Sequence, residues 1–149
     1  MRNSSISQIK NLAIKLSLNL KNGDFLFLHG DIGTGKTTLT RFIINNIQRK
    51  YKKRQTEIPS PTFNIALEYN IKNFIVRHFD LYRIKKKFEI NNIGLFEEMD
   101  NAITIVEWPE LIKKKPKNYI KISFKYSKKI NERNLRISSH GRCKEYEIN

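Results

Sequence analysis

The stretch FLFLHGDIGTGKTTLTRFI, residues 25–43, decides the fold of this chain. It opens with the apolar run Phe25 to Leu28, a pattern typical of a strand buried on both faces of an α/β sheet. A glycine-rich bend follows the run. Beyond it, apolar side chains recur every three or four residues, as in an amphipathic helix: Leu39, Phe42, Ile43 and Ile47. The stretch therefore predicts a strand, a tight loop and a helix, in that order.

The bend matches G-x-x-x-x-G-K-[ST], a pattern whose backbone N–H groups cradle the phosphates of a nucleotide. We expect Lys36 to reach the β and γ phosphates as a catalytic cation, and the hydroxyl of Thr37 to bind Mg²⁺. The N-terminal end of the following helix adds positive potential. A turn that used its glycines only for tightness would leave Lys36 and Thr37 unexplained. The predicted phosphate-binding residues are Gly30, Asp31, Gly33, Thr34, Gly35, Lys36, Thr37 and Thr38.

Two acidic residues end predicted strands further along the chain. Glu107 closes the run AITIV, and Asp80 closes the run FIVRHF. Carboxylates at strand ends beside a phosphate loop bind Mg²⁺ or orient the attacking water, so both are metal-binding and catalytic candidates. The alternative for Asp80 is an ion pair with Arg83 or a strand-end cap. The alternative for Glu107 is an N-cap of the segment that starts at Pro109.

Three more side chains lie near these positions in the sequence, and their roles are predicted from their residue types. Trp108 is either a packing residue or a wall of the nucleotide pocket. Thr62, on the stiff segment S-P-T, either senses the γ-phosphate as a switch threonine or only opens a strand. His78 is expected to be structural, because no metal-ligand set accompanies it in the sequence.

The remaining elements follow from caps, turns and periodicity. Ser5 and Gln8 form a capping box at the start of an amphipathic helix that Asn22-Gly23 ends. Residues 85–99 are expected to be helical or broken helical, interrupted at Gly94. Strands are expected over 63–69 and 74–81, joined as an antiparallel hairpin, and over 102–106, 119–126 and 134–139.

Length and composition limit the classes of protein to which this chain can belong. A chain of 149 residues with 39% hydrophobic residues favours one α/β domain over residues 1–149, with the last ten residues loosely packed. The single cysteine, Cys143, rules out an internal disulfide, and lysines interrupt the N-terminal apolar positions that a signal peptide would need. No apolar run approaches the roughly 20 residues of a membrane span. A cytoplasmic protein without membrane contact is predicted.

The net charge of +15 and the pI near 10.0 favour a polyanionic neighbour such as RNA. The abundance of lysine, asparagine and isoleucine also fits compositional drift in an AT-rich genome. The basic clusters are dispersed, and no recognisable RNA-binding module accompanies them: RKYKKR at 49–54, KKK at 85–87 and KKKPK at 113–117. Contact with tRNA, direct through this basic surface or only indirect, is therefore left open.

Several motifs together resemble the TsaE family (also called YjeE), small P-loop ATPases of bacterial tRNA threonylcarbamoyladenosine synthesis. HFDLYR and VEWPE are far more specific to this family than the phosphate loop is. The resemblance covers nearly the whole chain, in the order and spacing of the family. The matching pieces are GDIGTGKTT at 30–38, SPTF at 60–63, HFDLYR at 78–83, the spacing from Glu89 to Gly94, and VEWPE at 106–110.

The resemblance implies a three-layer, P-loop NTPase-like α/β fold with a mixed central sheet flanked by helices. It also implies ATP and Mg²⁺ at residues 33–38, metal-site or catalytic roles for Asp80 and Glu107, and a switch role for Thr62. Such proteins hydrolyse ATP slowly and act with TsaD and TsaB, which modify adenosine 37 of ANN-decoding tRNAs; TsaE is not the transferase. One departure is Ile9, which stands where the family often has a threonine that helps to hold adenine.

Two other functional classes share some of these features. A small nucleoside or metabolite kinase also has a P-loop, but it needs an arginine-bearing lid, whereas the arginines here are scattered and no lid-like insertion interrupts the chain. A non-catalytic basic RNA-binding or assembly module would carry a degenerate nucleotide site. The intact set of Lys36, Thr37, Asp80 and Glu107 argues against that decay.

Overall fold

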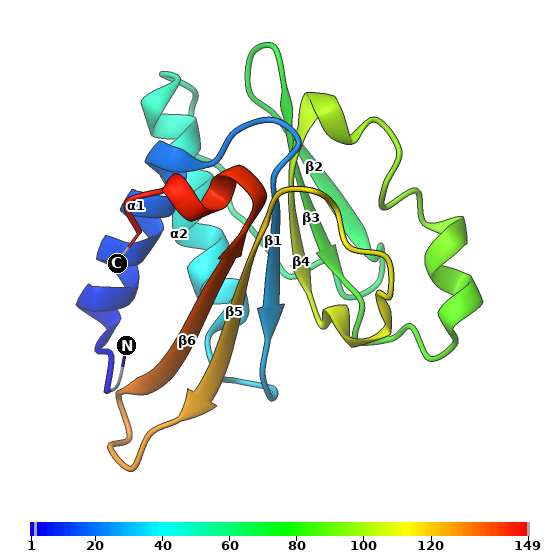
Figure 1. Ribbon diagram of the computed structural model, residues 1–149. Helices are drawn as coiled ribbons and strands as arrows, with labels where there is room; N and C mark the ends of the chain where they lie inside the picture. Colours follow the sequence, from blue (N-terminus) through cyan, green and yellow to red (C-terminus); the bar gives the residue numbers. More distant parts are fainter. Residues whose placement is uncertain (2, 149) are drawn as a thin grey trace.

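The computed structural model describes residue 1 and residues 3–148, and it contains a six-stranded mixed sheet of order β2-β3-β4-β1-β5-β6 (Figure 1). The four central strands are parallel, and β2 and β6 pair antiparallel at the two edges. The mixed α/β sheet predicted above is confirmed. The strands are β1 Phe25–His29, β2 Ala66–Asn70, β3 Ile75–Asp80, β4 Ala102–Glu107, β5 Tyr119–Tyr126 and β6 Arg133–His140.

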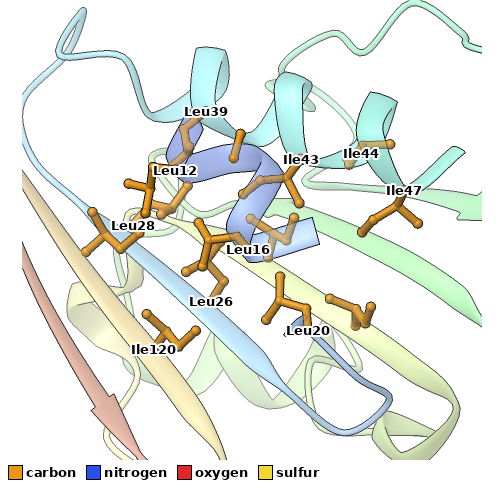
Figure 2. Close-up of a cluster of buried hydrophobic side chains, with 14 of the residues drawn as sticks. Leu12, Leu16, Leu20, Leu26, Leu28, Leu39, Ile43, Ile44, Ile47 and Ile120 are labelled. Atoms are coloured by element: carbon orange, nitrogen blue, oxygen red, sulfur yellow. The ribbon is translucent and has the colours of Figure 1, made fainter. Parts of the chain in front are cut away.

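Two α-helices cover one face of the sheet: α1 Ile6–Asn19 and α2 Lys36–Lys50 (Figure 1). The predicted capping box starts α1, since the Ser5 N–H donates to Gln8 Oε1 at 2.8 Å and the Gln8 N–H donates to Ser5 Oγ at 3.5 Å. The apolar stripes of both helices meet side chains from β1 and β5 in one core (Figure 2). This core includes Leu12, Leu16, Leu26, Leu28, Leu39, Ile43, Ile44, Ile47 and Ile120.

Short 3-10 segments, not α-helices, form the layer on the opposite face. The region from 85 to 99, expected to be helical or broken helical, contains η1 (Lys87–Asn92) and a break at Gly94, where φ is +65°. It buries Ile90 and Leu95 against Phe25 and Phe27 of β1. The other 3-10 segments are η2 Met99–Asn101, η3 Pro109–Leu111 and η4 Gly141–Glu145.

The hairpin of β2 and β3 is antiparallel as predicted, with Ala66 opposite Phe79 and Asn70 opposite Ile75. Its first strand is shorter than expected, because the chain turns through residues 62–64 and leaves the Phe63 side chain 83% exposed. The strand therefore begins only at Ala66.

The C-terminal residues differ from the loose segment that was expected. Cys143 and Ile148 are buried, and two polar side chains of this segment bind the buried carboxylate of Asp24. Arg142 Nε donates to Asp24 Oδ1 at 2.9 Å, and the Tyr146 hydroxyl donates to Asp24 Oδ2 at 2.5 Å. A buried carboxylate needs such partners, which orders the segment.

Among residues 1 and 3–148, none of the helices combines the length and apolar character that a transmembrane helix requires.

Candidate functional site

The glycine loop lies at the carboxyl end of the central strand β1, directly before the first turn of α2. Gly35 is the N-cap of α2 with φ of +108°, and it provides no side-chain cap to the first N–H groups of the helix. Gly30 has φ of +138°, and a Cβ atom there would lie 2.7 Å from the carbonyl oxygen of Phe124 in β5. Glycine therefore allows the loop to lie close to the sheet while the N-terminal amides of α2 stay open to an anion.

Lys36 is held inside the loop. Its Nζ donates to the carbonyl oxygens of Gly30 at 2.5 Å and Asp31 at 2.8 Å, and it lies 4.1 Å from the ring centroid of Trp108. Burial lowers the pKa of Lys36, and the charges of Glu107 and Asp80 are the largest opposing effects. The ammonium group is thus close enough to both candidate carboxylates to interact with them electrostatically.

Glu107 connects the loop to the sheet. One carboxylate oxygen, Oε2, accepts a hydrogen bond from the Thr37 hydroxyl at 2.9 Å, and the other, Oε1, lies 2.8 Å from His78 Nε2. Because a carboxylate only accepts, Nε2 carries the hydrogen. Glu107 is not the N-cap of the following segment: that position belongs to Trp108, which makes no side-chain cap bond.

Asp80 is the cross-strand partner of Glu107 at the carboxyl ends of the parallel strands β3 and β4. Neighbouring strands lie about 4.8 Å apart, so the two carboxylates start from adjacent positions. Asp80 Oδ2 accepts a hydrogen bond from the Ser60 hydroxyl at 2.8 Å, and Oδ1 accepts one from the Tyr82 N–H at 3.0 Å. The second bond is a strand-end cap, one of the alternatives considered for this residue.

The alternative ion pair of Asp80 is not formed. Among the described residues, the guanidinium of Arg83 has no salt-bridge partner, and it lies 4.8 Å from the ring centroid of Phe63.

A cavity of about 380 Å³ brings most of the predicted site residues together. Its walls come from the loop, the start of α2, the 60–62 segment and the ends of β3 and β4. Trp108 lies between this cavity and a neighbouring cavity of about 490 Å³, which Gly30 and Asp31 also line. The ring of Trp108 packs on the ring of Tyr82, with 4.9 Å between the ring centroids. The lining residues of the first cavity are Ile32, Gly33, Gly35, Lys36, Thr37, Thr38, Ser60, Thr62, Asp80, Tyr82, Glu107 and Trp108.

A further cavity of about 400 Å³ adjoins the loop on the side of α1. It shares Gly33, Gly35 and Thr38 with the first cavity, and Thr34 also lines it. Its other walls combine apolar, polar and basic side chains: Ile6, Ile9, Ile130, Asn131 and Arg133.

The donor set suits Mg²⁺ in a nucleotide site. Within the described part of the chain, no three His, Cys, Asp or Glu side chains gather as a metal-binding group. Mg²⁺ typically uses one or two carboxylates and takes its other oxygens from phosphates and water. The Thr37 hydroxyl and the Glu107 carboxylate, 2.9 Å apart at the mouth of the loop, fit that pattern.

The family model of the threonylcarbamoyl adenosine biosynthesis protein TsaE matches residues 3–135. The chain belongs to the TsaE family. A Rickettsia typhi relative is 40% identical over 110 residues, 74% of each chain, and a Haemophilus influenzae relative is 36% identical over 98 residues, 65% of this chain and 59% of that one. Both are named tRNA threonylcarbamoyladenosine biosynthesis protein TsaE. The crystal structure of YdiB from Bacillus subtilis is similar with a TM-score of 0.72 and 27% identity, covering 99% of this chain and 88% of that chain.

The structure adds two contacts to the predicted site residues of this TsaE-family chain. His78, which was expected to be structural, is buried and contacts Glu107, and Ser60, which was not singled out, contacts Asp80 through its hydroxyl. The period of two along a strand places His78 on the same face of β3 as Asp80, which is the signal that marks it. No comparable signal marks Ser60, because the segment around it has no regular secondary structure.

Proposed function

We propose that this chain is the ATP-binding and ATP-hydrolysing component of the tRNA threonylcarbamoyladenosine machinery, working with TsaD and TsaB and not as the transferase. Membership of the TsaE family and the names of the relatives support the pathway. The observation that carries the nucleotide chemistry is the bond from Thr37 to Glu107 at 2.9 Å, which joins the phosphate loop to a carboxylate at the sheet edge.

The roles of the residues follow from their positions. The backbone N–H groups of residues 33–38 bind the phosphates, and Lys36 exchanges its loop carbonyls for the β and γ phosphate oxygens. Thr37 and Glu107 would hold Mg²⁺, and the bound ion would neutralise charge on the phosphates. Asp80, on the adjacent strand end, orients the water that attacks the γ-phosphorus, so that the bond to the bridging oxygen breaks and ADP and phosphate leave. Thr62, in the wall of the same cavity, contacts the γ-phosphate end.

The cavity beside α1 takes the base end of the nucleotide. It is continuous with the phosphate cavity through Gly33, Gly35 and Thr38. Ile6, Ile9 and Ile130 offer apolar surface to a flat ring, whereas Ile9 has no hydroxyl to donate to it. Adenine is therefore held here mainly by packing.

Turnover by the isolated chain is slow in this proposal. No arginine among the described residues lines the cavity that contains Lys36, Thr37 and Glu107. In related phosphoryl-transfer sites an arginine supplied by a partner stabilises charge in the transition state. The kinase alternative, which requires an arginine-bearing lid, is not favoured by this cavity.

The test compares ATP hydrolysis by the wild-type chain, Lys36→Ala and Lys50→Ala, with Mg²⁺ and with and without TsaB and TsaD. Lys50 is an exposed lysine at the other end of α2, so it controls for loss of charge from that helix. We expect Lys36→Ala to lose hydrolysis and Lys50→Ala to retain it. The proposal would be overturned if Lys36→Ala hydrolysed ATP as fast as the wild-type chain does. It would also be overturned if the wild-type chain transferred phosphate to a nucleoside in a sustained reaction.

A cellular assay tests the pathway. Cells depleted of their own TsaE receive this chain or its Lys36→Ala variant, and threonylcarbamoyladenosine in tRNA is measured by mass spectrometry. We expect only the wild-type chain to restore the modified nucleoside. Equal restoration by both would show that nucleotide hydrolysis is not the function.

A further inference from the structure

Within residues 1 and 3–148, no helix covers one face of the hairpin of β5 and β6. On its inner face, Ile120, Ile122, Phe124 and Leu135 are buried in the core with α1 and α2. On the outer side of the sheet, the apolar layer over β1, β3 and β4 reaches only as far as Tyr119, which packs edge-on against Phe27. Among the described elements, no helix lies over the outer face of this hairpin (Figure 1), and Lys121, Lys125 and Arg136 on it are exposed.

The cross-strand register fixes which side chains share that outer face. Tyr119 pairs with His140, Lys121 with Ser138, Ser123 with Arg136 and Lys125 with Asn134. Directly paired residues project to the same side of a sheet. The stacked rings of Tyr119 and His140, 4.2 Å apart and inclined by 11°, show this alignment directly.

These positions contain no carboxylate and no aliphatic side chain. Lys121, Lys125 and Arg136 are exposed, and Lys115 joins them from the preceding loop, where its Nζ lies over the ring of Phe27 at 4.9 Å. We call these four cations, with the polar residues between them, the basic face. Burial lowers the pKa of Lys115, and the positive charge of Lys121 lowers it further. The carboxylate of Glu110 opposes this shift, and it also pairs with His29 at 3.0 Å.

The basic face is also hollowed. A cavity of about 710 Å³ is lined by Ser123, Lys125, Asn134 and Arg136 of this face and by the apolar side chains of Met1, Leu135 and Ile137. The hydroxyl of Ser123 and the amide of Asn134 therefore lie beside the cations in a concave surface. Such groups donate hydrogen bonds to phosphate oxygens, as lysine and arginine do.

We propose that the basic face binds the phosphate backbone of RNA. The choice of tRNA as this RNA rests on the proposed function in tRNA modification. A groove of cations without an interspersed carboxylate matches a polymer in which every repeat is anionic. An acidic protein surface presents neutral and basic groups as well, and a complementary partner for it would carry some carboxylates. The absence of aliphatic side chains from the paired positions likewise favours a polyanion over the apolar centre of a protein interface.

One end of the basic face lies at the edge of the sheet that carries the phosphate loop, because β5 is parallel to β1 and their carboxyl ends share that edge. On the opposite side of β5 from the basic face, the hydroxyl of Tyr126, which pairs with Arg133, donates to the carbonyl oxygen of Ile32 at 2.6 Å. RNA on β5 therefore lies beside the loop that holds the nucleotide, so that binding of RNA and of nucleotide can influence each other.

The test measures binding of a labelled transcript of an ANN-decoding tRNA by fluorescence anisotropy across a salt series. In one variant Lys121, Lys125 and Arg136 are each changed to Glu. The matched control changes Lys53, Arg54 and Lys72 to Glu, which alters the net charge equally at exposed positions on other elements. We expect the first variant to bind at least about tenfold more weakly and to lose roughly two to three units of salt slope, because each phosphate contact contributes nearly one unit. The control should change affinity less than about threefold.

Three outcomes would overturn the inference. In the first, the wild-type chain does not bind tRNA at low salt. In the second, the two variants lose tRNA affinity equally. In the third, polyglutamate displaces tRNA as readily as unlabelled RNA of equal charge does. The last result would assign the surface to an acidic protein. Circular dichroism and thermal unfolding show that each variant is folded.

Failure of this inference is separable from failure of the proposed function. The Lys36→Ala chain keeps the basic face, and it should bind tRNA as the wild type does even though it lacks ATP hydrolysis. Loss of tRNA binding on the basic face with intact ATP hydrolysis would conversely leave the proposed function standing.

Discussion

His78 Nε2 lies 2.8 Å from Glu107 Oε1, and the two side chains are 0% and 2% exposed. The other ring nitrogen of His78, Nδ1, is buried without a hydrogen-bond partner in the described structure. The imidazole thus has one polar contact, and this contact fixes the orientation of the carboxylate that faces Thr37. A buried residue of β3 therefore positions a proposed metal-binding residue of β4.

Removing the His78 contact should impair hydrolysis more than nucleotide binding. We expect His78→Leu to lower kcat for ATP about 10- to 100-fold, because residues that orient metal ligands have effects of this size. The KM for ATP should change little, since the phosphates are held mostly by backbone amides. His78→Gln, which retains an N–H donor, should recover part of the loss. The control is Thr104→Val, which changes a buried polar residue of the neighbouring strand β4 whose hydroxyl has no partner. If His78→Leu kept the wild-type kcat, the positioning role would be refuted.

The contact of Ser60 with Asp80 makes a second prediction. The Ser60 hydroxyl donates to Asp80 Oδ2 at 2.8 Å, so Ser60→Ala frees one side of the carboxylate proposed to orient water. We expect kcat to fall several-fold while labelled ATP binds as before. Ser139→Ala, in β6 and away from the cavity, serves as the control. A loss of ATP affinity as large as the loss of kcat would contradict this assignment.

Trp108 should report nucleotide binding. It is the single tryptophan of the chain, and the Lys36 ammonium lies 4.1 Å from its ring centroid. If Lys36 moves to phosphate oxygens, this cation–π contact changes, and we expect the fluorescence emission of Trp108 to change on addition of ATP and Mg²⁺. Lys36→Ala should show no such change. If calorimetry detects ATP binding but the emission of Trp108 does not change, Lys36 keeps its contact with the ring.

Cys143 should make stability decrease at alkaline pH. Burial, followed by the charge of Asp24, raises the pKa of the Cys143 thiol to about 12. The folded state thus favours the protonated thiol. This contribution is complete below the pKa of an ordinary thiol, about 8.5, and it is lost as the pH rises toward about 12. Urea unfolding at a series of pH values from 8 to 11 should show a steeper decline for wild type than for Cys143→Ala. Parallel curves would refute this linkage.

The core beneath α1 predicts a large difference between two nearby leucines. Leu16 is 0% exposed and Leu18 is 59% exposed, although both lie in the same helix. Leu16→Ala leaves a cavity between α1, α2 and β1, and we expect it to lower the free energy of unfolding by about 2 to 5 kcal/mol. Leu18→Ala should stay within about 0.5 kcal/mol of wild type. Chemical denaturation measures both, and similar losses would mean that the packing of α1 is wrong.

The sequence alone determined the parts that are contiguous in the chain. The strand at Phe25, the glycine bend and the helix from Lys36 are consecutive, so local glycine conformations and the apolar period were enough to predict them. The carboxylates at Glu107 and Asp80 were predicted for a related reason: each closes the sequence run of a strand, and parallel strands bring their carboxyl ends to one edge. The predicted antiparallel hairpin likewise needed only two strands and a turn.

Only the tertiary structure decided which of these pieces touch. The order β3-β4-β1 brings His78, Glu107 and Thr37 together, and the turn before β2 brings Ser60 to Asp80. The register of β5 with β6 likewise brought two lysines and one arginine that are dispersed in the sequence onto one face. These contacts join residues far apart in the chain, and neither periodicity nor spacing encodes strand order or register. The packing of the whole sheet selects both, because each strand must bury its apolar side chains against particular neighbours.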